Sequence, residues 1–236
     1  MSSRKRNEPV SNRLLAALPK KEYQQLLPKL EEVSLTLGDI LYEPGDSIQH
    51  VYFPNNSIIS LLAPVGDKEV LEVGLVGNDG MVGLSVFMGV AQTRNRGLVQ
   101  GSGTAMRMKS AALRKAVSNG GNLSKLLNLY THSLLTQVSQ SAACNRFHKI
   151  NARLARWLLM THDRVEGDEF YLTQEFISHM LGVRRELVTL SAGSLQKQKL
   201  ISYNRGRINI LNRAALEAVS CKCYRVVKEE YDNFLS

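Results

Sequence analysis

The spacing of hydrophobic positions changes twice along the chain. Near the N-terminus apolar residues recur at helical spacing, and Pro19 separates what we expect to be one or two short helices. From Val33 onward apolar and polar residues alternate in short runs, and turn signals such as Pro44-Gly45-Asp46 separate these runs. Many short strands punctuated in this way are typical of an antiparallel sandwich or barrel. We therefore predict a β domain of about ninety residues, with strands that include residues 40–42, 58–62, 70–73 and 105–108.

Helical spacing returns at residue 110 and predicts helices over residues 110–117, 122–147 and 150–162, the first two separated by Asn119-Gly120-Gly121. The middle helix would be ~39 Å long at about 1.5 Å per residue. It carries an apolar stripe at near-heptad spacing: Leu123, Leu127, Tyr130, Leu134 and Val138. A single helix cannot bury such a stripe alone, so we expect a coiled-coil contact with a second copy of the chain. The alternative is that the helix packs on its own β domain.

Residues 172–201 have the pattern of a helix, a tight turn and a second helix. Thr173 is a suitable N-cap, Gln174 suits the first helical turn, and Gly182 can adopt the positive φ that ends a helix. On the second helix, the buried side is predicted to hold Val183, Leu187, Val188 and Leu195. The outward side is predicted to hold Arg185, Glu186, Thr189 and Gln196, with the small residues Ala192 and Gly193. Such a face can read base edges in the major groove of double-stranded DNA, and Arg184 at its edge suits a phosphate.

The twelve residues after this second helix alternate as two short strands joined through Gly206, with Arg205 and Arg207 beside the turn. A basic hairpin in this place is a wing that can contact the DNA backbone. Seven Lys or Arg residues lie between positions 184 and 213, against the single acid Glu186. Residues 172–201 alone could be an ordinary helical hairpin with a solvated basic face, but the wing and this charge favour DNA binding. Asn212 is expected to cap a last helix running to about residue 235.

The composition supports a polyanionic partner and a cytoplasmic location. The chain of 236 residues has a formal net charge of +9, and its pI is about 9.6. Residues 1–11 are polar and basic, so we predict a disordered N-terminus and no signal peptide. No apolar run approaches the length of a membrane span, and we expect no membrane association.

The sequence offers no catalytic triad, phosphate-binding loop, metal pair or paired catalytic carboxylates, so we expect the chain not to be an enzyme. Its three cysteines, Cys144, Cys221 and Cys223, are too few and odd in number for a disulfide framework. On one helix Cys221 and Cys223 would point about 200° apart, a poor chelate. We therefore interpret them as reduced structural cysteines, with a thiol redox sensor as the alternative. No metal site is predicted from the five scattered histidines.

A β-roll, a long helix and a winged helix-turn-helix, in this order, resemble the Crp/Fnr family of bacterial transcription regulators. The resemblance includes a Gly-Asp-x-Leu-Tyr-x-x-Gly-Asp motif at residues 38–46. It implies an α+β fold with a jelly-roll-like antiparallel sensor domain (12–121), a dimerisation helix (122–148) and a winged helix-turn-helix DNA-binding domain (149–236). It further implies a homodimer, with RNA polymerase as a candidate partner. Arg185 and Glu186 match the Arg-Glu pair that family members use on bases, whereas Leu190 stands where a relative carries another base-reading arginine.

The sensor departs from the relatives that bind cyclic nucleotides. Those proteins hold the ribose with Gly-Glu-Leu/Ile-Ala, and this chain has Gly83, Leu84 and Ser85 at the matching place. Arg94 and Arg96 follow without the family's phosphate sequence. We therefore expect no cyclic AMP binding, an unknown effector and no assigned cofactor. Iron–sulfur ligation would need an N-terminal cysteine cluster that is missing, and His50 alone is more typical of a structural residue than of a haem ligand. The competing hypothesis is a cyclic-nucleotide receptor whose C-terminal domain binds protein.

Overall fold

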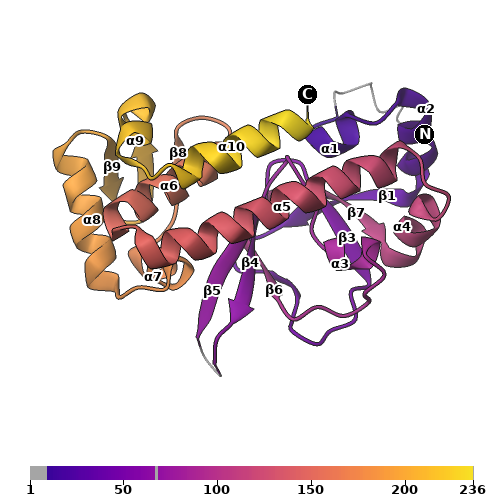
Figure 1. The fold of residues 1–236 in the computed structure, drawn as a ribbon, viewed down its shortest axis with the longest axis horizontal. Coiled ribbons are helices and arrows are strands. Elements are labelled where there is room, and N and C mark those ends of the chain that lie inside the picture. Colours follow the sequence, from indigo (N-terminus) through magenta and orange to yellow (C-terminus); the bar gives the residue numbers. More distant parts are fainter. Residues whose placement is uncertain (1–9, 67–68, 236) are drawn as a thin grey trace, which may run out of the picture.

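The structure is a computed structural model that describes residues 10–66 and 69–235. The chain forms an N-terminal β-roll, a long helix along one side of it, a smaller C-terminal domain, and a last helix that returns along the long helix (Figure 1). The architecture is α+β with antiparallel sheets, as predicted, and of the predicted alternatives, a sandwich or a barrel, the sheets do not close into a barrel. Of the predicted disordered residues 1–11, positions 1–9 lie outside the described residues. Within the described part of the chain, no helix is both long and apolar enough to cross a membrane.

The roll consists of two antiparallel sheets that enclose a core. Strands β1 (Leu30–Leu35), β7 (Gly103–Lys109) and β3 (His50–Pro54) form one sheet. The other has the order β2 (Ile40–Tyr42), β6 (Arg96–Gly101), β4 (Ile58–Pro64) and β5 (Val70–Val76). All four strands predicted from the alternation are present, and the completely buried side chains of Phe53, Ile59 and Val99 fill the space between the sheets.

Short helices close the ends of the roll. The predicted N-terminal pair is confirmed as α1 (Arg13–Ala16) and α2 (Lys20–Leu26), with Pro19 between them as the N-cap of α2, and a 3₁₀ turn (Leu27–Lys29) follows. Helix α3 (Leu84–Phe87) lies between β5 and β6 in the sequence, and α4 (Ser110–Val117) follows β7. Residues 110–117 were predicted with these bounds, because Asn119-Gly120-Gly121 ends the helical pattern.

The Gly-Asp motif builds the same turn twice. The carboxylate of Asp39 accepts a hydrogen bond from the backbone N–H of Thr36 at 2.8 Å, and Asp46 accepts one from Glu43 at 2.9 Å. The glycine before each aspartate has φ near +90°, a region that other residues rarely occupy. The motif therefore encodes two equivalent turns that bracket β2.

Helix α5 (Asn122–Phe147) has the predicted bounds, but its apolar stripe does not face a second copy of the chain. Leu123, Leu127 and Tyr130 are 3%, 0% and 0% exposed within this single chain. The Tyr130 ring packs so closely on the roll that a Cβ at Gly80 would lie 2.4 Å from it. Leu134 likewise approaches Gly74 of β5, and both Leu134 and Val138 are half-buried. Within one chain the roll therefore covers Leu123, Leu127 and Tyr130, as the alternative prediction stated, and these three side chains are not available for the expected coiled-coil contact.

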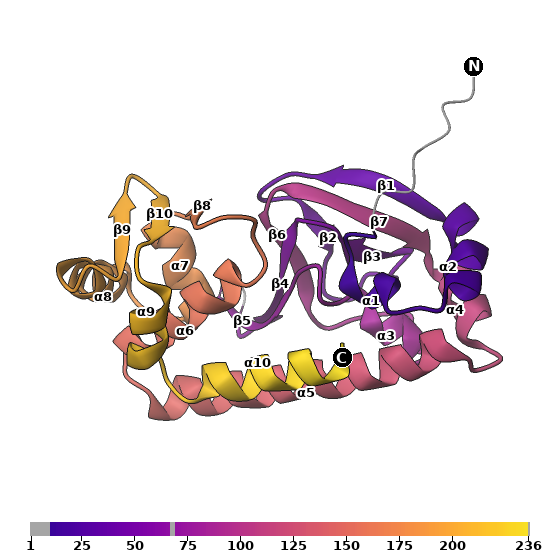
Figure 2. The ribbon, with the colours of Figure 1, turned by 90° about the horizontal axis from the view of Figure 1, so that it is seen from above.

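The rest of the stripe is covered by the C-terminal helix α10 (Cys223–Phe234), which lies alongside α5 (Figure 2). Tyr231 and Phe234 form an aromatic cluster with Tyr130, at centroid separations of 5.9 to 6.3 Å. The fully buried Gln137 joins three elements, because its amide bonds both the N–H and the C=O of Leu75 and also donates to the Tyr231 hydroxyl at 2.9 Å. The single last helix predicted after Asn212 is in fact two helices, α9 (Arg213–Val219) and α10. The helical conformation is interrupted at residues 220–222.

The C-terminal domain begins with α6 (Ile150–His162) and contains α7 (Gln174–Leu181), α8 (Arg185–Lys197) and α9. A third sheet, in the order β8 (Glu169–Tyr171), β10 (Arg207–Ile210) and β9 (Ile201–Asn204), holds the predicted hairpin. Strand β8 was not predicted. Asn212 caps α9 by accepting from the N–H of Ala215 at 3.0 Å, as its position suggested.

Three polar contacts join this domain to the roll. Trp157 of α6 donates to the Glu72 carboxylate of β5 at 2.7 Å, and Gln100 of β6 donates to the Thr161 hydroxyl at 3.3 Å. The third is a buried ion pair between Arg164 and Asp79, at 2.6 Å. Removal of one partner from such a pair costs more than its formation contributes, so these contacts fix the position of α6 on the roll.

Glu72 predicts a pH dependence of stability. Its carboxyl group is enclosed by Ser60 and Trp157, and burial raises its pKa to about 7, against the opposing effects of these hydrogen bonds and of Arg156 and Arg164. Between pH of about 4.5 and about 7, the Glu72 carboxyl group is protonated in the folded chain and ionised in the unfolded chain. The free energy of unfolding should therefore fall as pH rises from about 4.5 to about 7, by at most about 3 kcal/mol at about 1.4 kcal/mol per pH unit.

The side chain of the variant Glu72→Gln cannot ionise, so the free energy of unfolding of this variant should lack the fall that Glu72 causes. Denaturant unfolding of both proteins across this pH range measures it as the difference between the two curves. An identical slope in the two proteins would show that Glu72 ionises normally in the folded state.

Candidate nucleic-acid interface

The helix-turn-helix forms at the predicted residues. The Thr173 hydroxyl accepts a hydrogen bond from the N–H of Phe176 at 3.1 Å and so caps α7. Gly182 ends α7 with φ of 59° in the left-handed region, and its backbone N–H bonds to His179. Arg184 is the N-cap residue of α8 and is exposed. The turn thus directs α8 away from α7, along the outer surface of the domain.

Helix α8 exposes most of the side chains predicted to face DNA. Arg185, Glu186, Thr189 and Gln196 are exposed, and Val188 and Leu195 are buried as expected. Two positions differ from the prediction. Ala192 is 1% exposed and belongs to the core, whereas Leu187, predicted to be buried, is 42% exposed. The buried line of α8 is Val188, Ser191, Ala192 and Leu195. The small residue on the open side is therefore Gly193 alone.

Hydrogen bonds fix the relation of α8 to its neighbours. The Thr189 hydroxyl bonds to the Gln174 side chain at 2.7 Å and to the backbone carbonyl of Arg185 at 3.2 Å. At the other end of the helix, Gln196 donates to the backbone carbonyl of Tyr203 in β9 at 3.3 Å. The exposed polar residues of α7, α8 and the hairpin are thereby held as one surface, which we call the α8 face (Gln174, Arg184, Arg185, Glu186, Thr189, Gln196 and Arg205).

The hairpin turn has the conformation that a two-residue loop between twisted strands requires. Both central residues, Arg205 and Gly206, have positive φ, at 48° and 88°. A Cβ at Gly206 would lie 2.6 Å from the Tyr171 ring, so this position accepts only glycine. Arg205 projects its charge from the tip of the turn. Arg207 is exposed but forms an ion pair with Glu169 at 3.2 Å, which reduces its net charge toward a ligand.

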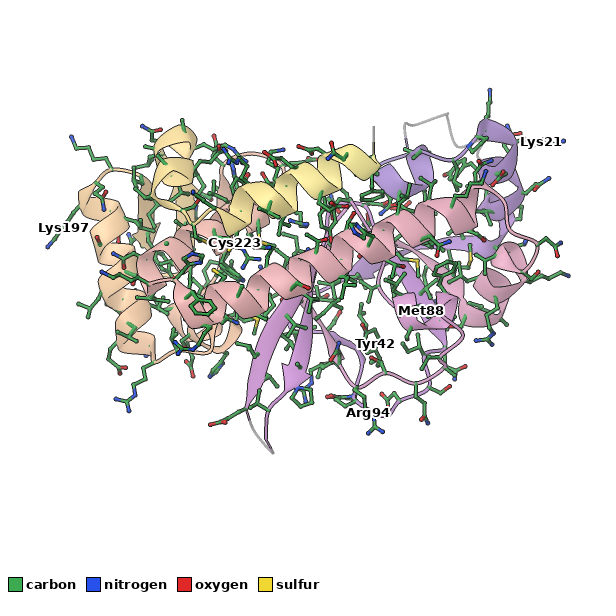
Figure 3. All side chains as sticks on the ribbon, in the orientation of Figure 1. Lys21, Tyr42, Met88, Arg94, Lys197 and Cys223 are labelled. Atoms are coloured by element: carbon green, nitrogen blue, oxygen red, sulfur yellow. The ribbon has the colours of Figure 1, made fainter. Side chains whose placement is uncertain are left out.

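Basic side chains surround the α8 face at one end of the molecule. Lys197, in the last turn of α8, points into solvent, and Lys21 of α2 lies at the opposite end (Figure 3). Glu186 is the only acid on α8. Such an arrangement can bind phosphates with its arginines and reach base edges with α8.

The predicted ligand-contacting residues of the roll do not form a comparable site. Gly83 is the N-cap of α3 with φ of 92°, Leu84 is 8% exposed, and Ser85 is half-buried beside it. Arg94 is exposed on the loop before β6 and points away from the roll (Figure 3). Arg96 forms an ion pair with Glu43 at 2.7 Å.

A second group of residues meets at the junction of α5, α6 and α10, where no site was predicted. Cys144, His148, Cys221 and Cys223 place their potential ligand atoms within 4.8 Å of one another. Cys221 and Cys223 were expected to be a poor chelate because two such residues on one helix point apart. In the structure Cys221 precedes α10 and only Cys223 belongs to it, so this geometry does not apply. The spacing of Cys144 and His148, four residues apart at a helix end, was the available signal, because such residues share a helix face.

The comparisons with known proteins agree with this geometry. Residues 152–219 match the model of the Crp-like helix-turn-helix domain. FixK2 from Bradyrhizobium japonicum has a similar structure (17% identity, 81% of this chain and 98% of that chain, TM-score 0.70). So do two transcriptional regulators from Thermus thermophilus, TTHB099 (17%, 80% and 96%, 0.64) and TTHA1359 (17%, 80% and 98%, 0.60). No curated protein matches the sequence significantly.

The chain has the Crp/Fnr fold. Its residues 152–219 are a Crp-like helix-turn-helix domain, and the fold deduced from the resemblance is confirmed. At 17% identity these structures establish the fold of the chain.

The wing of this Crp/Fnr-type chain predicts a sequence-independent contribution to DNA affinity. Arg205→Asn removes the charge and keeps a residue that tolerates positive φ. It should weaken binding to all DNA sequences alike and lower the slope of log affinity against log salt by about 1. Arg207→Ala should have a smaller effect because Glu169 already pairs with Arg207.

Fluorescence anisotropy over a salt series measures these effects, with the exposed Lys21→Ala as the matched loss of charge at the far end of the molecule. Equal changes of DNA affinity and of its salt dependence in Arg205→Asn and Lys21→Ala would rule out a contact between the wing and DNA.

Proposed function

We propose that this chain is a homodimeric, sequence-specific DNA-binding transcription regulator whose roll senses a signal other than a cyclic nucleotide. The observation that carries the proposal is the α8 face. It combines an exposed arginine, a carboxylate and short polar groups on a helix that a wing adjoins, within a domain that matches the Crp-like model. This chemistry suits base edges flanked by phosphates, and the net charge of +9 favours the same polyanion.

Arg185 is the residue that we expect to read sequence. It begins α8, it is exposed, and the hydrogen bond from Thr189 to its backbone carbonyl leaves its guanidinium free to approach a base. Arg185→Ala should cost roughly 1–3 kcal/mol on the preferred site and relax the preference at one base pair, for which guanine is the expected partner.

Selection of bound sequences from a random DNA pool, with wild type and Arg185→Ala in parallel, measures this change. Lys197→Ala serves as the control, because Lys197 is exposed at the other end of the same helix. Unchanged base preference in Arg185→Ala would refute this register of the recognition helix. A wild-type protein that selects no sequence at all would refute the proposed function.

The homodimer must use a different face of α5 from the one first expected. The roll and α10 cover the inner face, and the outer face carries two exposed leucines, Leu129 and Leu135, which are 50% and 62% exposed. His132 lies between them in the sequence and is exposed at the border with α10, where its imidazole contacts the Glu230 carboxylate at 2.8 Å. We place the contact with the second copy on this outer face, because a symmetric pairing would remove both leucines from water.

The double variant Leu129→Asp/Leu135→Asp should yield folded monomers that bind DNA weakly, since the two half-sites of a dimer operator lie about one helical turn (~34 Å) apart. Light scattering gives the mass, and Val90→Asp is the matched control at an exposed apolar residue of the roll, 52% exposed. Persistence of the dimer in the double variant would exclude this face.

The roll does not supply the groups that a cyclic nucleotide needs. Leu84, where a ribose-binding carboxylate is expected from the resemblance, is buried, and Arg96 is already paired with Glu43. A ribose hydroxyl buried without an acceptor costs about 1–3 kcal/mol. Calorimetric titration with cyclic AMP and cyclic GMP should therefore show no micromolar binding, and DNA binding should need neither. Micromolar affinity, or DNA binding that appears only with the nucleotide, would favour the cyclic-nucleotide receptor instead.

A further inference from the structure

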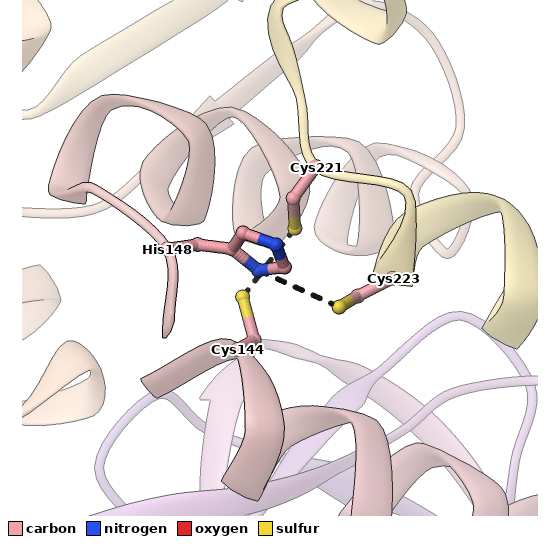
Figure 4. A group of neighbouring side chains, drawn as sticks. All are labelled: Cys144, His148, Cys221 and Cys223. Carbon is pink, nitrogen blue, oxygen red and sulfur yellow. Dashed lines mark hydrogen bonds between the residues drawn. The ribbon is translucent and has the colours of Figure 1, made fainter. Parts of the chain in front are cut away.

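Four residues with metal-binding side chains meet at the end of α5 (Figure 4). Cys144 lies in the last turn of α5, and His148 is the residue at its C-cap, where the chain turns into α6. Cys221 and Cys223 come from the start of α10, more than 70 residues further along the chain. The three cysteines are buried and His148 is exposed, so the group lies just beneath the surface with its imidazole on the solvent side.

The separations correspond to one coordination sphere. The sulfur atoms of Cys144 and Cys221 are 3.4 Å apart, and the Cys223 sulfur is 3.6 Å from Nδ1 of His148. In a tetrahedral zinc site, with Zn–S of about 2.3 Å and Zn–N of about 2.1 Å, neighbouring ligand atoms lie roughly 3.6–3.8 Å apart. A disulfide would need about 2.05 Å between two sulfurs. The side chains are therefore arranged as ligands around a point and not as a bonded pair.

We propose that Cys144, His148, Cys221 and Cys223 bind one structural zinc ion. Three thiolates and one imidazole complete a tetrahedral shell and leave no open position, which is the pattern of structural and not catalytic zinc. Soft sulfur donors favour zinc over magnesium or calcium.

The surrounding charge matches such a centre. Three thiolates with one divalent ion carry a net charge of −1, and the buried guanidinium of Arg156 lies close enough to act on all three cysteines. Arg156 is 6% exposed and bonds to the Ser141 hydroxyl, but its Nε has no hydrogen-bond partner. It forms no ion pair with any carboxylate in the part of the chain that the structure describes. A buried cation of this kind is stabilised by a nearby negative centre.

The position of the ion would give it a mechanical role. Cys144 and His148 hold the turn from α5 into α6, and Cys221 and Cys223 hold the first turn of α10. One ion would thus fasten the DNA-binding domain to the long helix at the point where the chain both enters and leaves it. Binding to the folded chain alone would also raise the melting temperature.

The first experiment uses the full chain purified without chelator. Elemental analysis should find one zinc per chain. After removal of the metal under reducing conditions, cobalt(II) should restore the melting temperature and produce the ligand-field bands of a tetrahedral centre together with thiolate charge-transfer absorption. Absence of stoichiometric zinc, an iron–sulfur chromophore in its place, or a mass that shows a Cys144–Cys221 disulfide in the purified chain would overturn the proposal.

The second experiment tests the ligands. His148→Ala should weaken zinc binding about tenfold or more in competition with a chromophoric chelator, and Cys223→Ser should do the same. His179→Ala, at an exposed histidine of α7, should leave zinc affinity unchanged. Because His148 is exposed, its variant should keep the circular dichroism of the wild type, which separates loss of a ligand from loss of the fold. If neither His148→Ala nor Cys223→Ser changed the zinc affinity, these residues would not be ligands and the proposed site would be wrong.

Discussion

The burial of the apolar stripe of α5 is the constraint on which the rest of the structure depends. The roll covers one side of the stripe and α10 covers the other, and Gln137 lies where the three meet. Each large apolar side chain buried in this way contributes about 1.5–3 kcal/mol. The buried amide adds specificity, because only one register of α5 lets it bond both backbone groups of Leu75 and the Tyr231 hydroxyl. The long helix therefore aligns the roll, the DNA-binding domain and the C-terminal helix in one step.

Sequence predicted the elements far better than it predicted their partners. The bounds of α4, α5 and α6 followed from glycine breaks and helical spacing, and Thr173, Gly182 and Asn212 act at the helix ends as their chemistry indicated. The cover of the α5 stripe could not be predicted, because a second copy, the roll or a later helix would satisfy the same spacing. The same limit applied to Ala192 and Leu187, since the phase of an amphipathic helix in a small domain is ambiguous by one residue when its neighbours are unknown.

Residues distant in sequence proved hardest to connect. Cys144 and Cys223 are separated by most of the DNA-binding domain, and only the return of α10 brings them together. The buried pair Asp79 and Arg164 has the same origin, since a loop of the roll and the end of α6 meet only after both domains are in place. The spacing of residues within one element does not predict contacts between distant parts of the sequence. The ion pair and the cysteine group can be recognised only when the fold is known.

The path of α10 has a consequence for how the DNA-binding domain can move. The chain enters this domain from α5 and leaves it into α10, and both helices run back beneath the roll, so that the C-terminus lies near α1 (Figure 1). A domain attached by one strand of chain can swing about a single pivot. The DNA-binding domain is attached at two neighbouring points, the end of α5 and the start of α10. It can therefore only rock about the line that joins these two points, unless α10 first separates from α5. Under the function proposed above, a signal received by the roll would act on DNA affinity by tightening or loosening the second attachment, and not by bending the long helix.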